Sequence, residues 1–339
     1  MTPPSQRGSN AMKAVRFSAF GPPPDVAQVV EESPVPLKPG EARLAVLATP
    51  INPSDLLTLS GEYGVLPKLP ATPGNEGVGR VVEVAGSDAV SVGDLVFLPL
   101  GSGTWRTHLT APAAQLLPVP PGLDLLQASM LLINPPTAYL MLRQFVTLQP
   151  GEWVVQNAAN SAVGRYLITL AQVMGLKTVN VVRRQALADE LKAQGADVVL
   201  LDTDELPQQV RAATGGAKVR LGIDAVGGDS ARRVGDCLTT GGVLVNYGAM
   251  SGKGPMLSAA ASIFKDVTLR GFWLTRWLRD APREEQNATL ARLAELMAVG
   301  TLQAPVDGTY PLERIQDAVK RALEPGRNGK ILLTPNPAA

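Results

Sequence analysis

Metal-ligating side chains are scarce in this sequence. Its 339 residues include one cysteine, Cys237, and one histidine, His108. A catalytic zinc site takes three protein ligands and a structural zinc usually takes four, drawn mainly from Cys and His. We therefore expect no metal site. Because Cys237 has no second cysteine to pair with, we interpret it as a small apolar side chain on a helix that precedes a strand.

Charge of one sign and long apolar runs are missing as well. The chain has 31 Lys and Arg against 30 Asp and Glu, a net charge of +1, which provides no basic surface for a nucleic acid or an acidic membrane. No apolar run reaches the roughly 18 to 20 residues that span a bilayer, and no apolar signal core stands near residue 1. We expect an intracellular protein with neither nucleic-acid nor membrane partners.

The first third of the chain contains mainly short strand candidates. Residues 1–11 are polar and rich in Pro, Ser and Gly, which predicts a disordered leader or a tag remnant. From residue 12 to about 127, strand candidates such as 42–48, 79–84 and 94–99 are separated by Pro and Gly. This punctuation predicts a compact β-rich domain.

After residue 127 short apolar runs alternate with helical stretches. The expected strands are 154–155, 178–182, 198–201, 221–225, 243–247 and 267–271, with helices at 163–174 and 185–194 among them. Such alternation predicts an α/β fold with a doubly wound parallel sheet. Two more helices, 284–299 with Gly300 as its C-terminal cap and 315–323, and a final strand, 330–333, follow.

A candidate phosphate-binding turn lies in residues 153–164, which read as a strand, a turn of small residues and a helix start. Small side chains let a phosphate approach, and the N–H groups and positive dipole end of the helix can hold a pyrophosphate. The usual G-x-G-x-x-G pattern is reduced to Gly164, with Ala and Ser at the other tight positions. Taken alone, the segment is equally compatible with a tight turn that binds nothing.

The next strand resolves the choice of cofactor. It is followed by Arg183 and Arg184, about 20 residues beyond the turn, where an NAD site carries Asp or Glu for the ribose hydroxyls. Guanidinium groups instead pair with a 2′-phosphate. The pattern predicts NADPH, against the alternative that the two arginines are solvated charges at the start of a helix.

Six motifs resemble those of one family across almost the whole chain. They are Ile51-Asn52-Pro53-Ser54-Asp55, Gly61-Glu62-Tyr63-Gly64, Gly74-Asn75-Glu76-Gly77-Val78, Gly103-Thr104-Trp105-Arg106-Thr107, Asn134-Pro135-Pro136-Thr137-Ala138-Tyr139 and Gln156-Asn157-Ala158-Ala159-Asn160-Ser161. The chain resembles the mitochondrial-type trans-2-enoyl thioester reductases, which are zinc-free medium-chain dehydrogenases/reductases related to quinone oxidoreductases. Zinc alcohol dehydrogenases of this superfamily have a metal-binding His where this chain has Asn75.

The resemblance implies a fold and a reaction. It implies a GroES-like catalytic domain, residues 12–127 and 277–339, and a Rossmann NADPH-binding domain, residues 128–276. The implied activity belongs to fatty-acid metabolism: hydride from NADPH adds to the β-carbon of a 2-enoyl thioester of CoA or acyl carrier protein, and the α-carbon is protonated with Tyr63 as acid. It further implies a homodimer, cytoplasmic if the source is bacterial and in the mitochondrial matrix if it is eukaryotic.

The resemblance also assigns the cofactor contacts. They are Asn134, Thr137, Asn160, Ser161, Ala162, Val163, Gly164, Arg183, Arg184, Tyr247, Gly248, Ala249, Met250, Phe272, Trp273, Leu274 and Lys330. One position departs from the family. Where relatives often read Arg-Asp-Arg, this chain reads Arg183-Arg184-Gln185, so the second phosphate-binding arginine is displaced by one place.

Other interpretations stay open at this point. An NADPH:quinone oxidoreductase shares the fold, and a non-catalytic NADPH-binding or regulatory protein is the alternative from another class. Without its motif, Tyr63 would be read as a half-buried loop aromatic. Trp105 and Trp273 could both be core aromatics, and we interpret His108 as a surface or packing residue and Tyr139 as packing.

Overall fold

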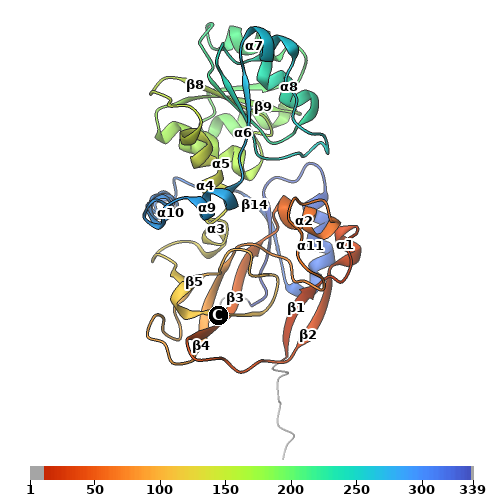
Figure 1. The fold of residues 1–339 in the computed structure, drawn as a ribbon, viewed down its shortest axis with the longest axis vertical. Helices are drawn as coiled ribbons and strands as arrows, with labels where there is room; N and C mark the ends of the chain where they lie inside the picture. The colour runs from red at the N-terminus through yellow and green to blue at the C-terminus, as the bar shows by residue number, and fades with distance from the viewer. Residues whose placement is uncertain (1–10, 337–339) are drawn as a thin grey trace, which may run out of the picture. The chain divides into compact units, whose positions relative to one another are not determined.

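The computed structural model describes residues 11–336, which form two compact units (Figure 1). Unit 1 combines the chain up to Leu132 with the chain from Pro305 onward, and unit 2 runs from Ile133 to Ala304. The expected leader falls almost entirely on residues 1–10, which lie outside the described residues. Within the described part, no helix has the length and apolar character needed to cross a membrane.

The two units differ from the expected domains at both boundaries. Residues 277–304, which the sequence analysis places in the GroES-like domain, belong to unit 2, because α10 (Arg283–Ala298) contacts α4 (Asn134–Gln144) of that unit. Residues 128–132, expected in the Rossmann domain, belong to unit 1. There the Leu132 N–H donates to the Glu76 carboxylate at 3.1 Å.

Unit 1 is built on a seven-stranded sheet. Its strands are β3 (Glu41–Pro50), β4 (Val78–Val84), β5 (Leu95–Phe97), β6 (His108–Pro112), β7 (Leu117–Pro118), β14 (Val306–Tyr310) and β15 (Lys330–Leu333). The order is β14-β15-β3-β4-β5-β7, β6 also pairs with β3, and only β14 and β15 are parallel. A second, antiparallel pair is β1 (Met12–Arg16) and β2 (Gln28–Glu32). The β-rich prediction is confirmed.

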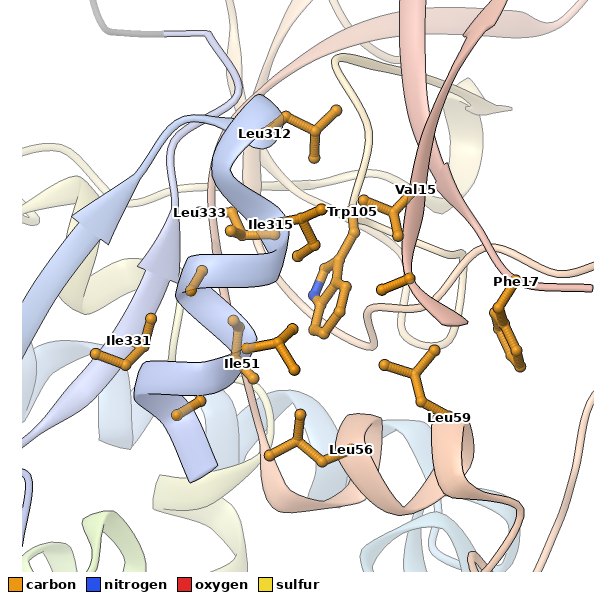
Figure 2. Close-up of a cluster of buried hydrophobic side chains, with 14 residues drawn as sticks. Val15, Phe17, Ile51, Leu56, Leu59, Trp105, Leu312, Ile315, Ile331 and Leu333 are labelled. Carbon is orange, nitrogen blue, oxygen red and sulfur yellow. The ribbon is translucent and has the colours of Figure 1, made fainter. Parts of the chain in front are cut away.

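The core of unit 1 gathers around Trp105, whose side chain is fully buried (Figure 2). The helices of the unit are α1 (Pro23–Val26), α2 (Pro53–Ser60), α3 (Leu125–Ala128) and α11 (Ile315–Leu323), with short 3-10 turns at Ala113–Gln115 and Leu312–Arg314. The indole packs among Val15 of β1, Leu59 of α2 and Ile315 of α11. Trp105 is therefore a core aromatic that joins the two ends of the chain in one unit.

Unit 2 is a six-stranded parallel sheet. Its order is β10 (Val198–Leu201), β9 (Lys177–Val182), β8 (Trp153–Gln156), β11 (Leu221–Asp224), β12 (Val243–Asn246) and β13 (Thr268–Gly271). The chain winds outward from β8 in both directions, so the order reverses between β8 and β11. This is the doubly wound arrangement that the alternation predicts, and ligands bind such sheets beyond the carboxyl ends of the strands at the reversal.

The sequence of unit 2 explains its elements. Val154, Val155, Val179 and Val181 are fully buried, as central parallel strands covered on both faces require. The helices are α4, α5 (Ala162–Val173), α6 (Ala188–Ala193), α7 (Leu206–Ala213), α8 (Gly228–Asp236), α9 (Leu274–Asp280) and α10, with a π turn at Ala260–Phe264. One expected helix, 185–194, instead begins as a 3-10 turn, Gln185–Leu187, before α6.

Candidate active site

Most of the predicted cofactor residues lie at one edge of the unit 2 sheet. Residues 157–164 follow β8, 183–184 follow β9, 247–250 follow β12 and 272–274 follow β13. Because all of these strands are parallel, their carboxyl ends meet at the same edge. The structure therefore brings together segments that are up to about a hundred residues apart in sequence.

The turn after β8 packs closely against the start of α5 because Gly164 has no side chain. A Cβ atom on Gly164 would lie 2.6 Å from the Ala159 carbonyl oxygen and 2.8 Å from that of Ala158, so no side chain fits there. Ser161 caps α5, and its Oγ accepts the Gly164 N–H at 3.1 Å. The first N–H groups of a helix have no partner inside the helix, which leaves the start of α5 able to bind an anion.

Two predicted cofactor segments touch each other at Ser161. Its side chain forms a hydrogen bond with the phenol of Tyr247 in the loop after β12, and burial raises the pKa of that phenol while the hydrogen bond opposes the rise. In the same loop a Cβ on Gly248 would lie 2.9 Å from the Ala225 carbonyl oxygen. Met250 is 59% exposed and its N–H donates to that same carbonyl at 3.0 Å.

The two arginines expected at a 2′-phosphate are exposed at the end of β9. Arg183 and Arg184 directly follow Val182, and within the described part of the chain neither forms an ion pair. The other exposed or half-buried arginines of unit 2 include several that are paired, such as Arg220 with Glu152 at 2.7 Å. Two uncompensated guanidinium groups at the cofactor edge fit an anionic ligand there.

The remaining predicted contacts of unit 2 lie in the segment after β13 and in α4. Phe272 is buried against Phe145 in an edge-to-face contact of 6.2 Å, whereas Trp273 is 37% exposed. Trp273 is therefore not a fully buried core aromatic. Asn134 and Thr137 are buried in the first turns of α4, where the Thr137 hydroxyl donates to the Ile133 carbonyl at 2.6 Å.

Tyr63 lies in unit 1, in the loop that follows α2. The loop begins at Gly61, which adopts φ +83° and caps the helix, and the Tyr63 N–H donates to the Leu57 carbonyl at 3.1 Å. The side chain is half-buried, while Glu62 and Gly64 on either side are exposed. A capped helix end thus holds the backbone of the predicted catalytic residue.

Lys330 is in unit 1 too, and its side chain is buried. Its Nζ donates to Asn52 Oδ1, and Asn52 Nδ2 donates to Glu76 Oε1 at 2.8 Å. Asp55 accepts from the Asn52 N–H at 2.8 Å and from Asn75 Nδ2 at 2.6 Å. These five residues, the Lys330 cluster, join α2, the start of β4 and β15.

Burial dominates the acid–base properties of the Lys330 cluster. Desolvation raises the pKa of Asp55 to about 6 and that of Glu76 to about 7, although Lys330 and the neighbouring hydrogen bonds lower both. Desolvation lowers the pKa of Lys330 to about 8, against the attraction of Glu76. Three ionisable groups in one buried site therefore titrate between about pH 6 and 8.

The sequence analysis missed several polar residues that the structure gathers around these sites. In unit 1 it quoted Asn52, Asp55 and Glu76 within motifs but gave them no role. In unit 2 it passed over Asp224 and Asn246, which are the last residues of β11 and β12. The sequence did carry a signal for Asp224 and Asn246, because each is the one polar residue at the end of an otherwise apolar strand.

The remaining side chains with possible metal or nucleophilic chemistry have ordinary surroundings. His108 is half-buried with its Nδ1 3.1 Å from Thr107 Oγ1, and burial lowers its pKa. Cys237 ends α8 half-buried, and burial raises its pKa to about 12. Within residues 11–336 no group of three or more His, Cys, Asp or Glu side chains is arranged to hold a metal ion.

Comparison with known proteins agrees with this arrangement. Residues 38–121 match the alcohol dehydrogenase GroES-like domain, and residues 162–295 match the zinc-binding dehydrogenase family. The mitochondrial enoyl-[acyl-carrier-protein] reductase of Homo sapiens is 39% identical over 331 residues, covering 94% of this chain and 88% of that protein.

Solved structures similar to this chain include quinone reductases and 2-enoyl thioester reductases. A protein from Bacillus thuringiensis described as an NADPH:quinone reductase is 31% identical with a TM-score of 0.88, over 96% of this chain and 99% of that one. The mitochondrial 2-enoyl thioester reductase Etr1p/Etr2p heterodimer from Candida tropicalis is 28% identical with a TM-score of 0.87, over the same shares. The chain belongs to the medium-chain dehydrogenase/reductase superfamily and, within it, to the family of the mitochondrial-type enoyl-[acyl-carrier-protein] reductases.

Proposed function

We propose that this protein is an NADPH-dependent, zinc-independent reductase of 2-enoyl thioesters. The observation that carries the proposal is the 39% identity to an enoyl-[acyl-carrier-protein] reductase over 94% of the chain. A structure of Etr1p in complex with NADP and crotonyl-CoA is also similar to this chain, with a TM-score of 0.87 and 27% identity. The predicted cofactor segments at the carboxyl ends of β8, β9, β12 and β13 support the same assignment.

The residues at that edge fit NADPH. The N–H groups at the start of α5 would hold the pyrophosphate, and the exposed Arg183, with Arg184 beside it, would hold the 2′-phosphate. Residues 247–250 and 272–274, with Asn134 and Thr137, would contact the rest of the cofactor. When bound, NADPH supplies the hydride that the β-carbon of the substrate accepts.

Tyr63 would act on the other half of the reaction. Negative charge grows on the thioester oxygen as an enolate forms, and the α-carbon then needs a proton. A phenol can donate both a hydrogen bond and a proton. Its backbone is fixed at the capped end of α2, which favours a defined position for the ring.

The substrate is an acyl thioester of CoA or of acyl carrier protein, and the protein is a homodimer. Its place is the bacterial cytoplasm or the mitochondrial matrix, according to its source. The 31% identity to a quinone reductase keeps NADPH:quinone oxidoreduction as the second candidate.

Isotope transfer tests the proposed reaction. Crotonyl-CoA is incubated with the protein and NADPH that carries deuterium at the transferred position of C4, in ordinary water. We expect butyryl-CoA with one deuterium at C3 and a solvent hydrogen at C2. Consumption of NADPH without a saturated thioester product would rule out the proposed function.

A further inference from the structure

A buried carboxylate lies beneath the cofactor edge of unit 2. Asp224 is the last residue of β11, next to the point where the strand order reverses, and its side chain is fully buried. Its Oδ1 accepts the N–H groups of Val226 and Gly227, both at 3.0 Å, and its Oδ2 is 3.3 Å from the Gly227 nitrogen. The carboxylate therefore folds the loop after β11 around itself.

Asn157 connects Asp224 to the phosphate turn. Its Oδ1 accepts the Ala225 N–H at 2.8 Å, which fixes the orientation of the amide, since a backbone N–H can only donate. Asn157 Nδ2 must therefore be the group that faces Asp224 Oδ1, at 2.6 Å, and Ser230 Oγ, at 2.9 Å. Both N–H donors of the Asn157 amide and its oxygen therefore have hydrogen-bond partners.

Asn246 connects Asp224 to a third segment. At the end of β12, its Nδ2 donates to Asp224 Oδ2 and to the Gly248 carbonyl, each at 2.7 Å. Gly248 belongs to the loop that carries Tyr247, which in turn contacts Ser161 in the phosphate turn. The loops after β8, β11 and β12 are thus tied to the two oxygens of one carboxylate.

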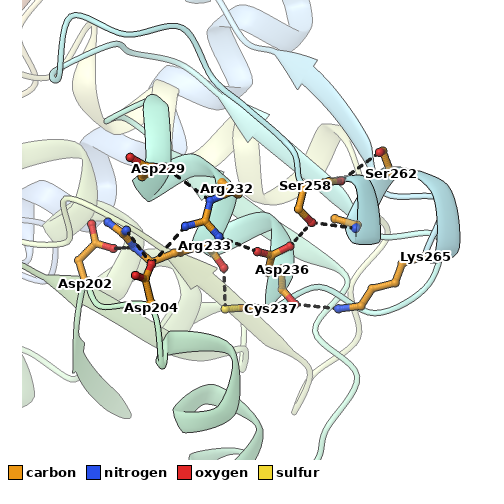
Figure 3. A network of polar contacts seen from close by, with 11 residues as sticks. Asp202, Asp204, Asp229, Arg232, Arg233, Asp236, Cys237, Ser258, Ser262 and Lys265 are labelled. Carbon is orange, nitrogen blue, oxygen red and sulfur yellow. Dashed lines mark hydrogen bonds and ion pairs between the residues drawn. The ribbon is translucent and has the colours of Figure 1, made fainter.

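The same network extends to the helix that follows β11. Ser230 of α8 donates to Asp202 at 2.6 Å, and Asp202 forms an ion pair with Arg233 at 2.7 Å. Figure 3 shows Asp202 and Asp204, which follow β10, beside Arg232 and Arg233 of α8. Asp202 directly follows β10, so one network of hydrogen bonds links the ends of four strands.

We propose that Asp224 is a positioning residue for the bound nicotinamide cofactor. The inference rests on the proposed NADPH site and adds a residue that does not itself touch the ligand. Both oxygens face N–H donors, so a neutral amide at this place would put an NH₂ group against at least one of them. The loops after β8 and β12, which would hold the cofactor, would then lose their common anchor, and hydrogen bonds to a buried charge are among the stronger ones.

Cofactor binding by Asp224→Asn tests the inference. Dissociation constants for NADPH and NADH are measured by titration, at a temperature where circular dichroism shows the variant to be folded. We expect both constants to rise about tenfold to a hundredfold, since the loops hold the part common to the two cofactors. A purely structural role would lower the melting temperature and leave the constants of the folded protein unchanged.

Two further variants complete the test. Asp197→Asn is the matched control, because Asp197 also accepts a backbone N–H, from Thr178 at 2.8 Å, but at the opposite edge of the sheet; its NADPH affinity should equal that of the parent. Asn246→Ala removes one donor from Asp224 and should weaken NADPH binding about threefold to tenfold, even if Asp224→Asn does not fold.

The outcomes separate the inference from the proposed function. If the parent protein binds NADPH and both Asp224→Asn and Asn246→Ala bind it within twofold of the parent, the positioning role is wrong and the proposed function stands. If Asp224→Asn does not fold, an unchanged affinity in Asn246→Ala overturns the role by itself. If the parent protein does not bind NADPH, the proposed function fails and the inference fails with it.

Discussion

Tyr63 and Arg183 each lie just beyond the end of a helix or strand. Their side chains differ in burial and in the ion pairs they form. Tyr63 follows the cap of α2 and is half-buried, whereas Arg183 follows β9 and is exposed without an ion pair in the described chain. A half-buried phenol suits contact with a reacting group. An exposed, uncompensated guanidinium suits recognition of a phosphate in solution.

Replacing Tyr63 by Phe should affect turnover more than binding. The variant keeps the ring and loses only the hydroxyl, so we expect kcat with crotonyl-CoA to fall about a hundred- to ten-thousandfold and KM to change little. NADPH affinity, measured by titration, should stay at the parent value. Equal kcat values for variant and parent would remove Tyr63 from the mechanism.

Replacing Arg183 by Ala should remove the preference for NADPH. We expect the parent to bind NADPH at least about tenfold more tightly than NADH, because a lost charge-assisted pair at a phosphate costs about 1.5 to 3 kcal/mol. In Arg183→Ala the two constants should approach each other, with the NADH constant unchanged. Arg184→Ala is the comparison, and its preference for NADPH over NADH should fall less than that of Arg183→Ala. A full preference retained in Arg183→Ala would show that another group recognises the phosphate.

At the scale of elements, the start of α5 depends on one glycine. Gly164→Ala places a Cβ within 2.6 Å of the Ala159 carbonyl oxygen, so the phosphate turn must move. Overpacking of this kind costs about 1 to 3 kcal/mol, and we expect the NADPH dissociation constant to rise about fivefold or more. Gly254→Ala is the control, since a Cβ there meets nothing within 4 Å. Similar NADPH binding by both variants would contradict the assigned role of the turn.

The Lys330 cluster joins α2, β4 and β15 and makes unit 1 sensitive to pH. In the folded protein the pKa of Glu76 is raised from 4.5 to about 7, so the folded state holds this proton more tightly than the unfolded chain does. The corresponding stability is complete below about pH 4.5 and is lost as the pH rises to about 7.

Glu76→Gln should flatten this part of the pH profile. Between pH 5 and 8 the melting temperature of the variant should fall by several degrees less than that of the parent. Loss of the Glu76 charge also lowers the pKa of Lys330 further. A lower pKa of Lys330 in the folded protein makes stability rise with pH in that range, so it also reduces the fall in melting temperature. Glu285→Gln, at an exposed position on α10, should follow the parent curve. Parallel curves for Glu76→Gln and the parent would contradict the assigned titration.

At the scale of the whole molecule, the fold was predictable because its signals are local. The central strands carry short buried apolar runs, such as Val154-Val155 in β8 and Val181-Val182 in β9, and α5 and α11 carry periodic apolar faces. The element types and the doubly wound class of the sheet therefore followed from the sequence. The strand-end positions of the phosphate turn and of Arg183 and Arg184 followed from the same pattern, whereas residues 247–250 and 272–274 were assigned from the family resemblance.

Contacts between distant segments were not predictable in this way. The role proposed for Asp224 depends on its hydrogen bonds with Asn157 and Asn246, which are 67 and 22 residues away in sequence. The hydrogen bond from Lys330 to Asn52, 278 residues away, likewise has no local signal in the sequence. The position of residues 277–304 depends on the packing of α10 against α4, which helical periodicity alone does not specify.

Steady-state turnover tests the central claim most directly. The kcat/KM of NADPH oxidation is compared for crotonyl-CoA, a long-chain enoyl-CoA and a benzoquinone, with the parent and with Tyr63→Phe. The account predicts that an enoyl thioester is the best substrate of the parent and that only thioester reduction collapses in the variant. A benzoquinone that is reduced faster than either thioester, with thioester turnover unchanged by Tyr63→Phe, would contradict the account and favour a quinone reductase.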